Sequence, residues 1–443
     1  MKALKIILVL VIIVVVLIGA GLLYLNHYVQ SPAFQDTVRQ AARDLLGANV
    51  TITEMKISLL EGVTLRGIAI ANPPGFTGNL LTADSFVLRY RLLPLLSKRV
   101  AIEKLAIEKP VVALVRDSTG AFNYEKLGGA KPVAQPTGGT TKSGGTSLDV
   151  DLSSLALSDG EVSMAGEGGK LLVKLAGLGL DTSVALAGNK MTGRGNARIG
   201  EINVANSIFV REVKAPVVMG ANDIQLSPLS GQLAGGTIGG GLTVQTAGAF
   251  KYVVDLTAKD SDVPKLLQEM GTKAVMTGKL QLSTKLEGTG GLPTMTGGGK
   301  AEIVNGQLTG IPILNLLGTL LQVPELQNLQ FSECVLEYTL ANNVMQTPVI
   351  KLTSPYVQIA GSGAMELEKY TLNHTMTLAV AKSVLAKTPK EIQGAFKDRG
   401  DGYLTVDFKV TGPYDSPKTD LSQRLLKGAG EQLLQKGLQK LLK

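Results

Sequence analysis

Apolar and polar residues alternate with a period of two along most of this chain, which predicts β-strands. The alternation is clearest in three stretches, residues 249–258, 279–288 and 403–412. In each stretch one face is apolar and the other carries charged or hydroxyl side chains, which is typical of an antiparallel sheet with one wet face. The apolar positions are Phe250, Tyr252, Val254, Leu256, Leu280, Leu282, Leu286, Leu404, Val406, Phe408 and Val410.

Shorter runs rich in Val, Ile, Leu and Thr fill residues 50–117, and similar runs follow one another from Leu148 onward. Gly, Pro and Asn separate these runs, as expected between strands. Residues 128–147 are dense in Gly, Thr and Pro without apolar periodicity, so we expect a flexible linker there. The fold class predicted is mainly β: a long, curled, antiparallel-type sheet that forms an apolar groove, with few helices.

Helical periodicity is confined to a few segments. Ser31 and Pro32 are typical of a helix start, and Gly47 of a helix end, so we expect a helix between them. Residues 263–270 and 311–322 predict two more. The last segment, 421–443, predicts a basic amphipathic helix that either lies on a membrane or partner, or caps the end of the sheet. Its candidate contact residues are Leu425, Leu426, Leu433, Leu434, Leu441, Lys427, Lys436 and Lys440.

Residues 6–25 form an uncharged apolar stretch that is long enough to cross a bilayer. It is longer than the apolar region of a cleaved signal peptide and has no convincing cleavage site. We therefore expect an uncleaved signal anchor that leaves residues 1–5 in the cytoplasm and places most of the chain on the other side of the membrane. No Cys follows the segment, which excludes lipoprotein processing.

Composition changes the picture in two ways. The chain has 52 glycines, no tryptophan and only 4% aromatic residues, which favours extended sheet over an aromatic-lined substrate pocket. Its net charge is +8. This charge is spread out, except at the C-terminus, and no Lys/Arg run is interleaved with aromatic residues, so we expect no nucleic-acid partner.

Residues with catalytic chemistry are scarce. The two histidines, His27 and His374, cannot form a zinc motif, and His374 lies on an apolar strand face where a buried core residue is expected. The single Cys334 is expected to be a small core residue. Neither a GxSxG elbow nor a P-loop occurs, so we expect no enzyme activity, no cofactor and no metal.

So many one-sided strands produce more apolar surface than the few helices can cover. The apolar face must meet a second sheet, a curled continuation of its own sheet, or something other than protein. A trough lined with aliphatic side chains would suit acyl chains. The apolar positions named above within residues 250–256, 280–286 and 404–410 are therefore the candidate lipid contacts. Periodicity alone does not distinguish such a trough from a β-sandwich.

Three ordered motifs occur in the N-terminal region: on Gly62, Leu65, Gly67, Ile70, Asn72 and Pro73, on residues 92–96, and on Pro110, Leu114, Arg116, Asp117, Gly120 and Asn123. They resemble those of the AsmA family of bacterial envelope proteins. We expect the last group to be a strand, a turn at Asp117 and a structural role for Asn123, which would hold the returning segment. A second, C-terminal region resembles the same family from about residue 262 onward.

The resemblance implies an inner-membrane anchor and a periplasmic β-rich groove that binds and moves phospholipid or maintains lipid homeostasis between envelope membranes. The alternative is a non-enzymatic assembly or structural factor for outer-membrane protein biogenesis. The C-terminal helix would reach the outer membrane or an envelope partner. The predicted organisation is tail 1–5, transmembrane anchor 6–25, AsmA-like N-terminal helix and β region 31–127, linker 128–147, middle β region 148–259, AsmA-like C-terminal β domain 260–420 and amphipathic helix 421–443.

Overall fold

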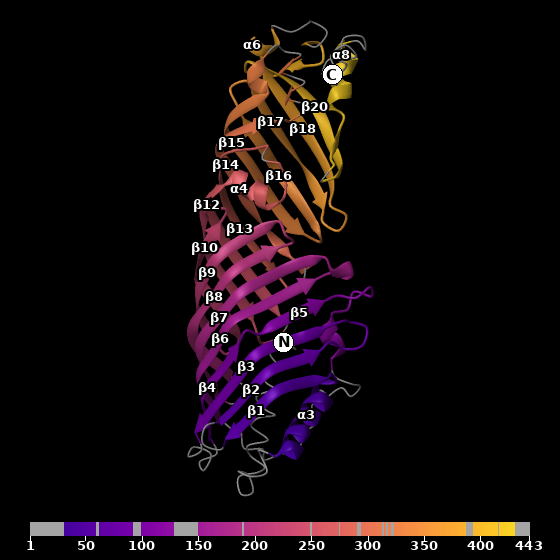
Figure 1. Ribbon diagram of the computed structural model, residues 1–443. Helices are drawn as coiled ribbons and strands as arrows, with labels where there is room; N and C mark the ends of the chain where they lie inside the picture. Colours follow the sequence, from indigo (N-terminus) through magenta and orange to yellow (C-terminus); the bar gives the residue numbers. More distant parts are fainter. Residues whose placement is uncertain are drawn as a thin grey trace. The chain divides into compact units, whose positions relative to one another are not determined.

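Strands make up most of the structure, so the mainly β prediction is confirmed. The computed structural model describes residues 31–58, 62–91, 99–127, 149–187, 190–248, 250–273, 275–289, 294–311, 314–315, 318–319, 323–386, 393–414 and 416–429. Within these residues, 21 strands are assigned to one hydrogen-bonded sheet (Figure 1). The predicted anchor 6–25 and linker 128–147 lie outside them.

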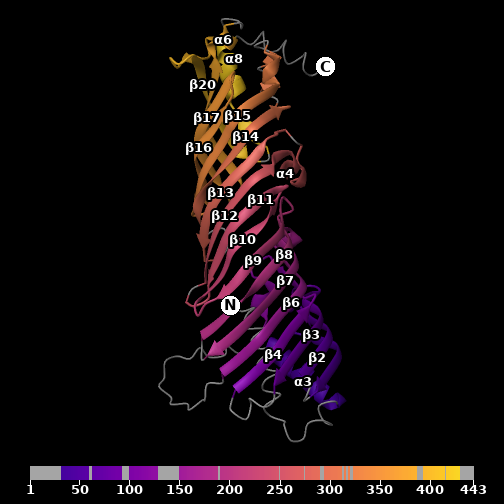
Figure 2. The same ribbon diagram turned by 90° about the vertical axis from the view of Figure 1, so that its left-hand side faces the viewer.

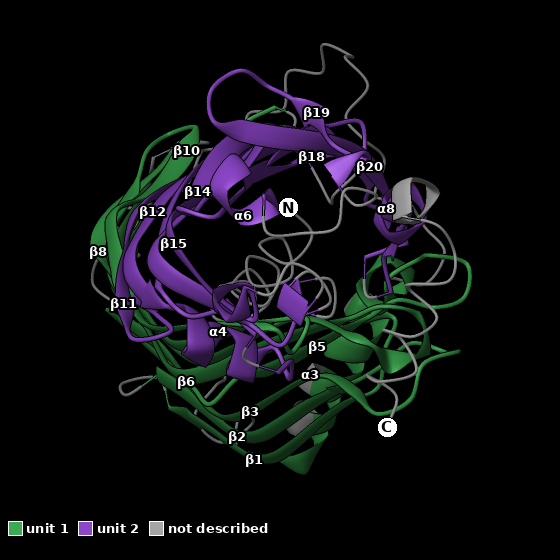
Figure 3. Ribbon diagram, turned by 90° about the horizontal axis from the view of Figure 1, so that it is seen from above, with its two compact units in different colours: residues 1–231, 243–250 green, residues 232–242, 251–443 purple. Residues whose placement is uncertain are grey.

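The chain divides into two compact units, which are coloured separately in Figure 3. Unit 1 comprises residues 1–231 and 243–250, and unit 2 comprises residues 232–242 and 251–443. Strands β10 (Asp223–Leu233) and β11 (Gly236–Gln245) have residues in both units. The other elements of unit 1 are α3 (Pro32–Leu46), β1 (Val50–Ser58), β2 (Gly62–Ala71), β3 (Asn79–Arg91), β4 (Arg99–Glu108), β5 (Val111–Val115), η2 (Asn123–Lys126), β6 (Asp149–Ala165), η3 (Glu167–Gly169), β7 (Leu171–Ala187), β8 (Lys190–Val204) and β9 (Ile208–Met219).

Helix α3 occupies the segment that the sequence predicts. Gly47 follows it with a φ of 61° and donates its N–H to the carbonyl of Arg43 at 2.8 Å, the left-handed ending that favours glycine. On the side that faces the sheet, Ala42 and Leu46 are buried and pack with Val50 in one core cluster. This cluster continues across β2, β3 and β4, so the helix covers the apolar face of the first strands.

Two parallel pairs are exceptions to the predicted antiparallel-type sheet. Strands β4 and β5 both pair in parallel with β6, with Ile102 opposite Leu152 and Val112 opposite Val162. The reason is the long connection, residues 116–148, since parallel neighbours need a crossover of at least about a dozen residues. The pairs β1–β2, β2–β3, β3–β4, β6–β7, β7–β8 and β8–β9 are antiparallel.

Unit 2 is antiparallel in every described pair from β12 to β21, and Figure 2 shows β12 to β17 in succession. Its elements are β12 (Lys251–Asp262), α4 (Val263–Glu269), β13 (Lys279–Gly288), β14 (Thr296–Thr309), η5 (Pro324–Leu326), β15 (Asn328–Ala341), β16 (Val344–Thr353), β17 (Val357–Glu366), β18 (Thr371–Ala381), α6 (Lys382–Leu385), β19 (Lys397–Asp398), β20 (Tyr403–Pro413), β21 (Lys418–Thr419) and α8 (Leu421–Ala429).

The predicted helix at 263–270 is present as α4. Its N-cap is Asp262, whose carboxylate accepts the N–H of Lys265 at 3.0 Å and so satisfies a donor of the first turn. Of the helix predicted at 311–322, residues 311, 314–315 and 318–319 are described; residue 311 is not helical, and the other four are.

The main core of unit 2 lies where helices cover its last strands. In Figure 3 the strands of unit 2 curve, and α6 lies on their concave side. Val384 of α6 and Leu421 of α8 belong to the same cluster as Leu378 of β18 and Phe408 of β20. The apolar face of these strands is therefore covered by protein.

Candidate functional site

Apart from Phe250, the apolar residues predicted on three separate strands share one face of unit 2. Val254 of β12 lies opposite Leu286 of β13, and Leu280 begins a row of paired residues that reaches Val406 of β20. That row is Leu280, Ile303, Cys334, Leu352, Ile359, Leu378 and Val406. We call this face, which includes the residues packed against α6, the inner face.

The opposite face, which we call the outer face, is charged. Lys251 pairs with Glu287 at 2.9 Å across β12 and β13, and Lys351 pairs with Glu333 at 3.0 Å across β15 and β16. These side chains are partly exposed to solvent, which screens their charges, so each pair adds little stability. Their effect is to make the two faces chemically distinct, as the alternation predicts.

The inner-face residues predicted on β12 and β13 are only partly covered. Tyr252, Val254, Leu256, Leu280, Leu282 and Leu286 are all half-buried. None of them belongs to either core cluster or is packed against one. Phe250 precedes β12, belongs to unit 1 and is 40% exposed. The inner face of β12 and β13 is thus apolar without the helical cover that protects the later strands.

The candidates on β20 lie in a different environment. Val406 and Phe408 are 8% and 9% exposed and belong to the core cluster, while Leu404 and Val410 pack against it. An apolar cavity of about 210 Å³ remains beside this cluster, and Leu378, Phe408 and Leu421 are among the residues that line it. In this structure the four β20 residues contact protein.

The C-terminal helix starts as a cap on the sheet. Leu421 and Leu425 are each 3% exposed within the core of unit 2. Asp420 fixes this start, because its carboxylate accepts the N–H of Lys409 at 2.7 Å and the Arg424 guanidinium at 2.8 Å. These two donors hold the pKa of Asp420 below its usual range.

The other residues proposed for membrane or partner contact remain predictions. Leu426 and Lys427 belong to helix α8. The others lie outside the described residues: Leu433, Leu434, Lys436, Lys440 and Leu441. Among the helices that the structure does describe, none is long and apolar enough to cross a bilayer. The predicted anchor lies outside the described residues.

His374 is a buried core residue, as the sequence predicts. It is 7% exposed on the inner face, and its Nε2 lies 2.8 Å from the hydroxyl of Thr347. Burial lowers the pKa of its imidazole. Cys334 packs against the same core, and burial raises the pKa of its thiol. In the described part of the chain, no group of three or more His, Cys, Asp or Glu side chains is arranged to hold a metal ion.

Asn123 connects two of the N-terminal motifs. It is fully buried, and its amide donates to the carbonyl of Ala113 at 2.7 Å and to Oδ1 of Asn72 at 2.8 Å. Its oxygen accepts the N–H groups of Val115 at 3.2 Å and Tyr124 at 3.0 Å. The predicted structural role is confirmed, whereas the direct bond to Asn72, 51 positions away, was not predicted.

The turn beside Asn123 depends on Asp117. Its carboxylate accepts the N–H groups of Thr119 at 2.9 Å and Ala121 at 3.1 Å, and it pairs with Lys126. These partners, Lys126 first, hold the pKa of Asp117 well below its usual range. Strand β5 is only partly covered, since Val111 is 38% exposed. The hairpin is a structural element.

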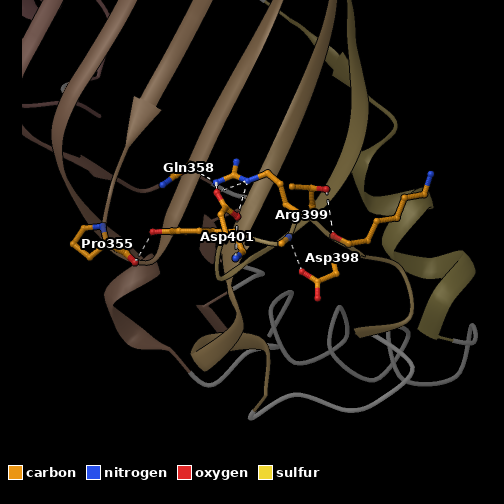
Figure 4. A network of polar contacts seen from close by, with 9 residues as sticks. Pro355, Gln358, Asp398, Arg399 and Asp401 are labelled. Carbon is orange, nitrogen blue, oxygen red and sulfur yellow. Dashed lines mark hydrogen bonds and ion pairs between the residues drawn. The ribbon is translucent and has the colours of Figure 1, made fainter.

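At one end of β17 and β20, charged side chains likewise pair with neighbouring polar groups in a network (Figure 4). The Arg399 guanidinium donates to Asp401 at 2.9 Å and to Gln358 at 2.8 Å, while Lys382 pairs with Asp398 at 2.7 Å. Each of these ionic groups has its partner within the network. The network therefore fixes the loop before β20 to β17.

Comparison with known proteins bears on the N-terminal motifs. A model described as the AsmA family matches residues 1–200. This match identifies residues 1–200 as an AsmA-family region. The matched range contains the hydrogen-bonded Asn72 and Asn123 and extends into β8. The AsmA-like region predicted from about residue 262 lies beyond the match and remains a prediction. No curated protein and no solved structure matches the chain.

Proposed function

We propose that this protein binds and moves phospholipid, or maintains lipid homeostasis, between bacterial envelope membranes. The observation that carries the proposal is the inner face of β12 and β13, where a row of half-buried aliphatic side chains belongs to no protein core. Burial of each CH₂ of an acyl chain contributes about 0.8 kcal/mol. The proposal involves no enzymatic step, cofactor or nucleic acid.

The dimensions of unit 2 suit acyl chains. Its inner face extends over eight strands, β12 to β18 and β20, which have seven spacings. At ~4.8 Å per spacing this is roughly 34 Å. A hydrocarbon core of ~30 Å contains two leaflets, so one acyl chain spans about 15 Å. Both chains of a phospholipid therefore have room along this face.

In this proposal residues 6–25 hold the protein in the inner membrane by a single pass, and most of the chain lies in the periplasm. The C-terminal helix would contact the outer membrane or an envelope partner. It would do so with the residues that follow Leu421 and Leu425, which pack in the core of unit 2. The apolarity of residues 6–25 and the amphipathic pattern of residues 421–443 support this arrangement.

The test is transfer of a fluorescent phospholipid between vesicles by the full-length protein, with mass spectrometry of the lipid that co-purifies. Leu282→Asp places a charge on the inner face and should abolish most transfer. Ser283→Asp places the same charge at the next residue of β13, which lies on the outer face, and should leave transfer unchanged. A wild-type protein that carries no lipid and transfers none contradicts the proposal and favours the assembly-factor alternative.

A further inference from the structure

Polar side chains on the inner face of unit 2 fall in a single row across the strands. Thr284 of β13 lies opposite Gly299 of β14, which lies opposite Tyr338 of β15. After a β-bulge between β15 and β16, the row continues through Thr347, Gly363 and His374. We call Thr284, Tyr338, Thr347 and His374 the polar row.

The polar row consists of two hydrogen-bonded pairs, each of which passes over a glycine. The hydroxyls of Thr284 and Tyr338 are 2.8 Å apart, and a Cβ on Gly299 would lie 2.9 Å from the Tyr338 oxygen. A Cβ on Gly363 would likewise lie 2.6 Å from the His374 ring. Side chains on alternate strands meet because the strand between them presents no side chain.

The hydrogen positions follow from the partners. Thr284 gives its only hydroxyl hydrogen to the carbonyl of Gly298 at 3.2 Å, so Tyr338 must donate to Thr284. Thr347 gives its hydrogen to the carbonyl of Gly363 at 3.1 Å, so Nε2 of His374 must carry a hydrogen. The Tyr338 oxygen, whose hydrogen is engaged with Thr284, therefore keeps lone pairs that can accept, and His374 Nδ1, which carries no hydrogen, is a second acceptor.

Both neighbouring rows of the inner face are apolar or glycine. One is Leu282, Ala301, Leu336, Ile350, Gly361, Met376 and Phe408. The other is Leu286, Gly297, Leu340, Met345, Met365, Leu372 and Gly412. From β13 to β18 the polar row crosses five spacings, about 24 Å at ~4.8 Å each. The face thus has a line of acceptors between two apolar lines.

We propose that the polar row binds the hydrogen-bond donors, hydroxyl or ammonium, in the polar part of an amphiphile whose chains lie on the two apolar rows. Tyr338 is the principal contact, because it is half-buried, while Thr347 and His374 are 1% and 7% exposed. The row thereby selects among lipids by headgroup. This inference rests on the proposed lipid-binding function.

The same two hydrogen-bonded pairs could serve only to hold the strands together, without any ligand. That role predicts a different result for lipid binding. A locking role changes stability alone, whereas an acceptor row discriminates between headgroups of equal chain length. An acceptor that loses its ligand donor costs one net hydrogen bond, which corresponds to roughly threefold to tenfold in affinity. Headgroup preference is therefore the informative measurement.

The full-length protein is given vesicles of phosphatidylglycerol, phosphatidylethanolamine and phosphatidylcholine with identical acyl chains, and the bound lipid is quantified by mass spectrometry. Only the choline headgroup lacks an N–H or O–H donor. Wild-type protein should favour phosphatidylglycerol or phosphatidylethanolamine over phosphatidylcholine by roughly threefold to tenfold. Which of these two is favoured identifies the donor as hydroxyl or ammonium.

Tyr338→Phe removes the phenol oxygen and should abolish the preference without reducing total bound lipid. Tyr356→Phe removes an equivalent hydroxyl from an exposed residue between β16 and β17 and should retain the preference. If Tyr338→Phe does not fold, Thr284→Val tests the same point, because it frees the Tyr338 hydrogen and weakens the acceptor.

Lipid bound without headgroup preference, or a preference retained by Tyr338→Phe or Thr284→Val, overturns the polar-row proposal and leaves the lipid-binding function intact. A wild-type protein that binds none of the three lipids contradicts the lipid-binding function itself.

Discussion

Replacement of Asn123 by Ala tests how the N-terminal motifs of the AsmA family hold unit 1 together. Asn123 is fully buried, and its side chain makes four hydrogen bonds: with Val115, Tyr124, Ala113 and Asn72. Asn123→Ala leaves all four partner groups without their bond. A buried polar group that stays unpaired costs about 1–3 kcal/mol. If water reaches two of the four groups, the remaining two cost about 2–6 kcal/mol.

The effect should be local, because the lost bonds lie between β5, η2 and the turn after β2. Hydrogen–deuterium exchange of the full-length protein reports the opening free energy of each segment. At about 1.4 kcal/mol per factor of ten, the lower estimate predicts roughly thirtyfold faster exchange in residues 72–78 and 111–127. Strands of unit 2 should exchange as in the wild type.

Asn196→Ala is the matched control, since Asn196 is an exposed residue on β8 of the same unit. A substitution at such a position changes stability by at most about 0.5 kcal/mol. Exchange in residues 72–78 that rises less than about twofold in Asn123→Ala would refute the argument that the Asn72–Asn123 bond joins the two motifs. An equal rise in Asn196→Ala would show a nonspecific effect.

Three further predictions concern unit 2. Truncation after Asp420 removes Leu421 and Leu425 from the core. At ~1.5–3 kcal/mol for each leucine, this should lower the unfolding free energy by up to about 3–6 kcal/mol. An unchanged melting temperature would contradict the packing role of the two leucines. Burial lowers the pKa of His374, so the unfolded state binds more protons than the folded state. The stability that neutral His374 contributes should be complete above about pH 6.5 and lost as the pH falls through the lower folded pKa. His374→Gln should therefore show a flatter pH dependence of the unfolding free energy in chemical denaturation. Gly363→Ala should destabilise unit 2 by more than about 1 kcal/mol, because its Cβ would lie 2.4 Å from a backbone oxygen; a melting temperature equal to that of the wild type would contradict this close approach.

The sequence predicts which residues of a strand share a face, but it does not predict what covers that face. Val254 and Val406 follow the same alternation, yet Val254 is half-buried outside the cores and Val406 is 8% exposed within one. The difference arises from α6 and α8, which pack only on the later strands. Such cover depends on tertiary packing, which periodicity does not encode.

Local chemistry was predictable where its partners are close in the sequence. The Gly47 helix end and the Asp117 turn follow from single residues and their neighbours. The bond from Asn123 to Asn72 and the alignment of Tyr338 with Thr284 both depend on strand register. Register requires the pairing order and each bulge, and a shift of one residue would move every side chain to the other face.

The most direct test of the account is contact between acyl chains and the inner face of unit 2. A photoreactive residue is placed at Leu282 or Val254 of the full-length protein in phospholipid vesicles, and crosslinked lipid is detected by mass spectrometry. The same probe at Ser283, on the outer face, and at Val406, within the core, provides the controls. The account predicts crosslinks to lipid at Leu282 and Val254 that exceed those at both controls. Equal labelling at all four positions, or none at Leu282 and Val254, would contradict it.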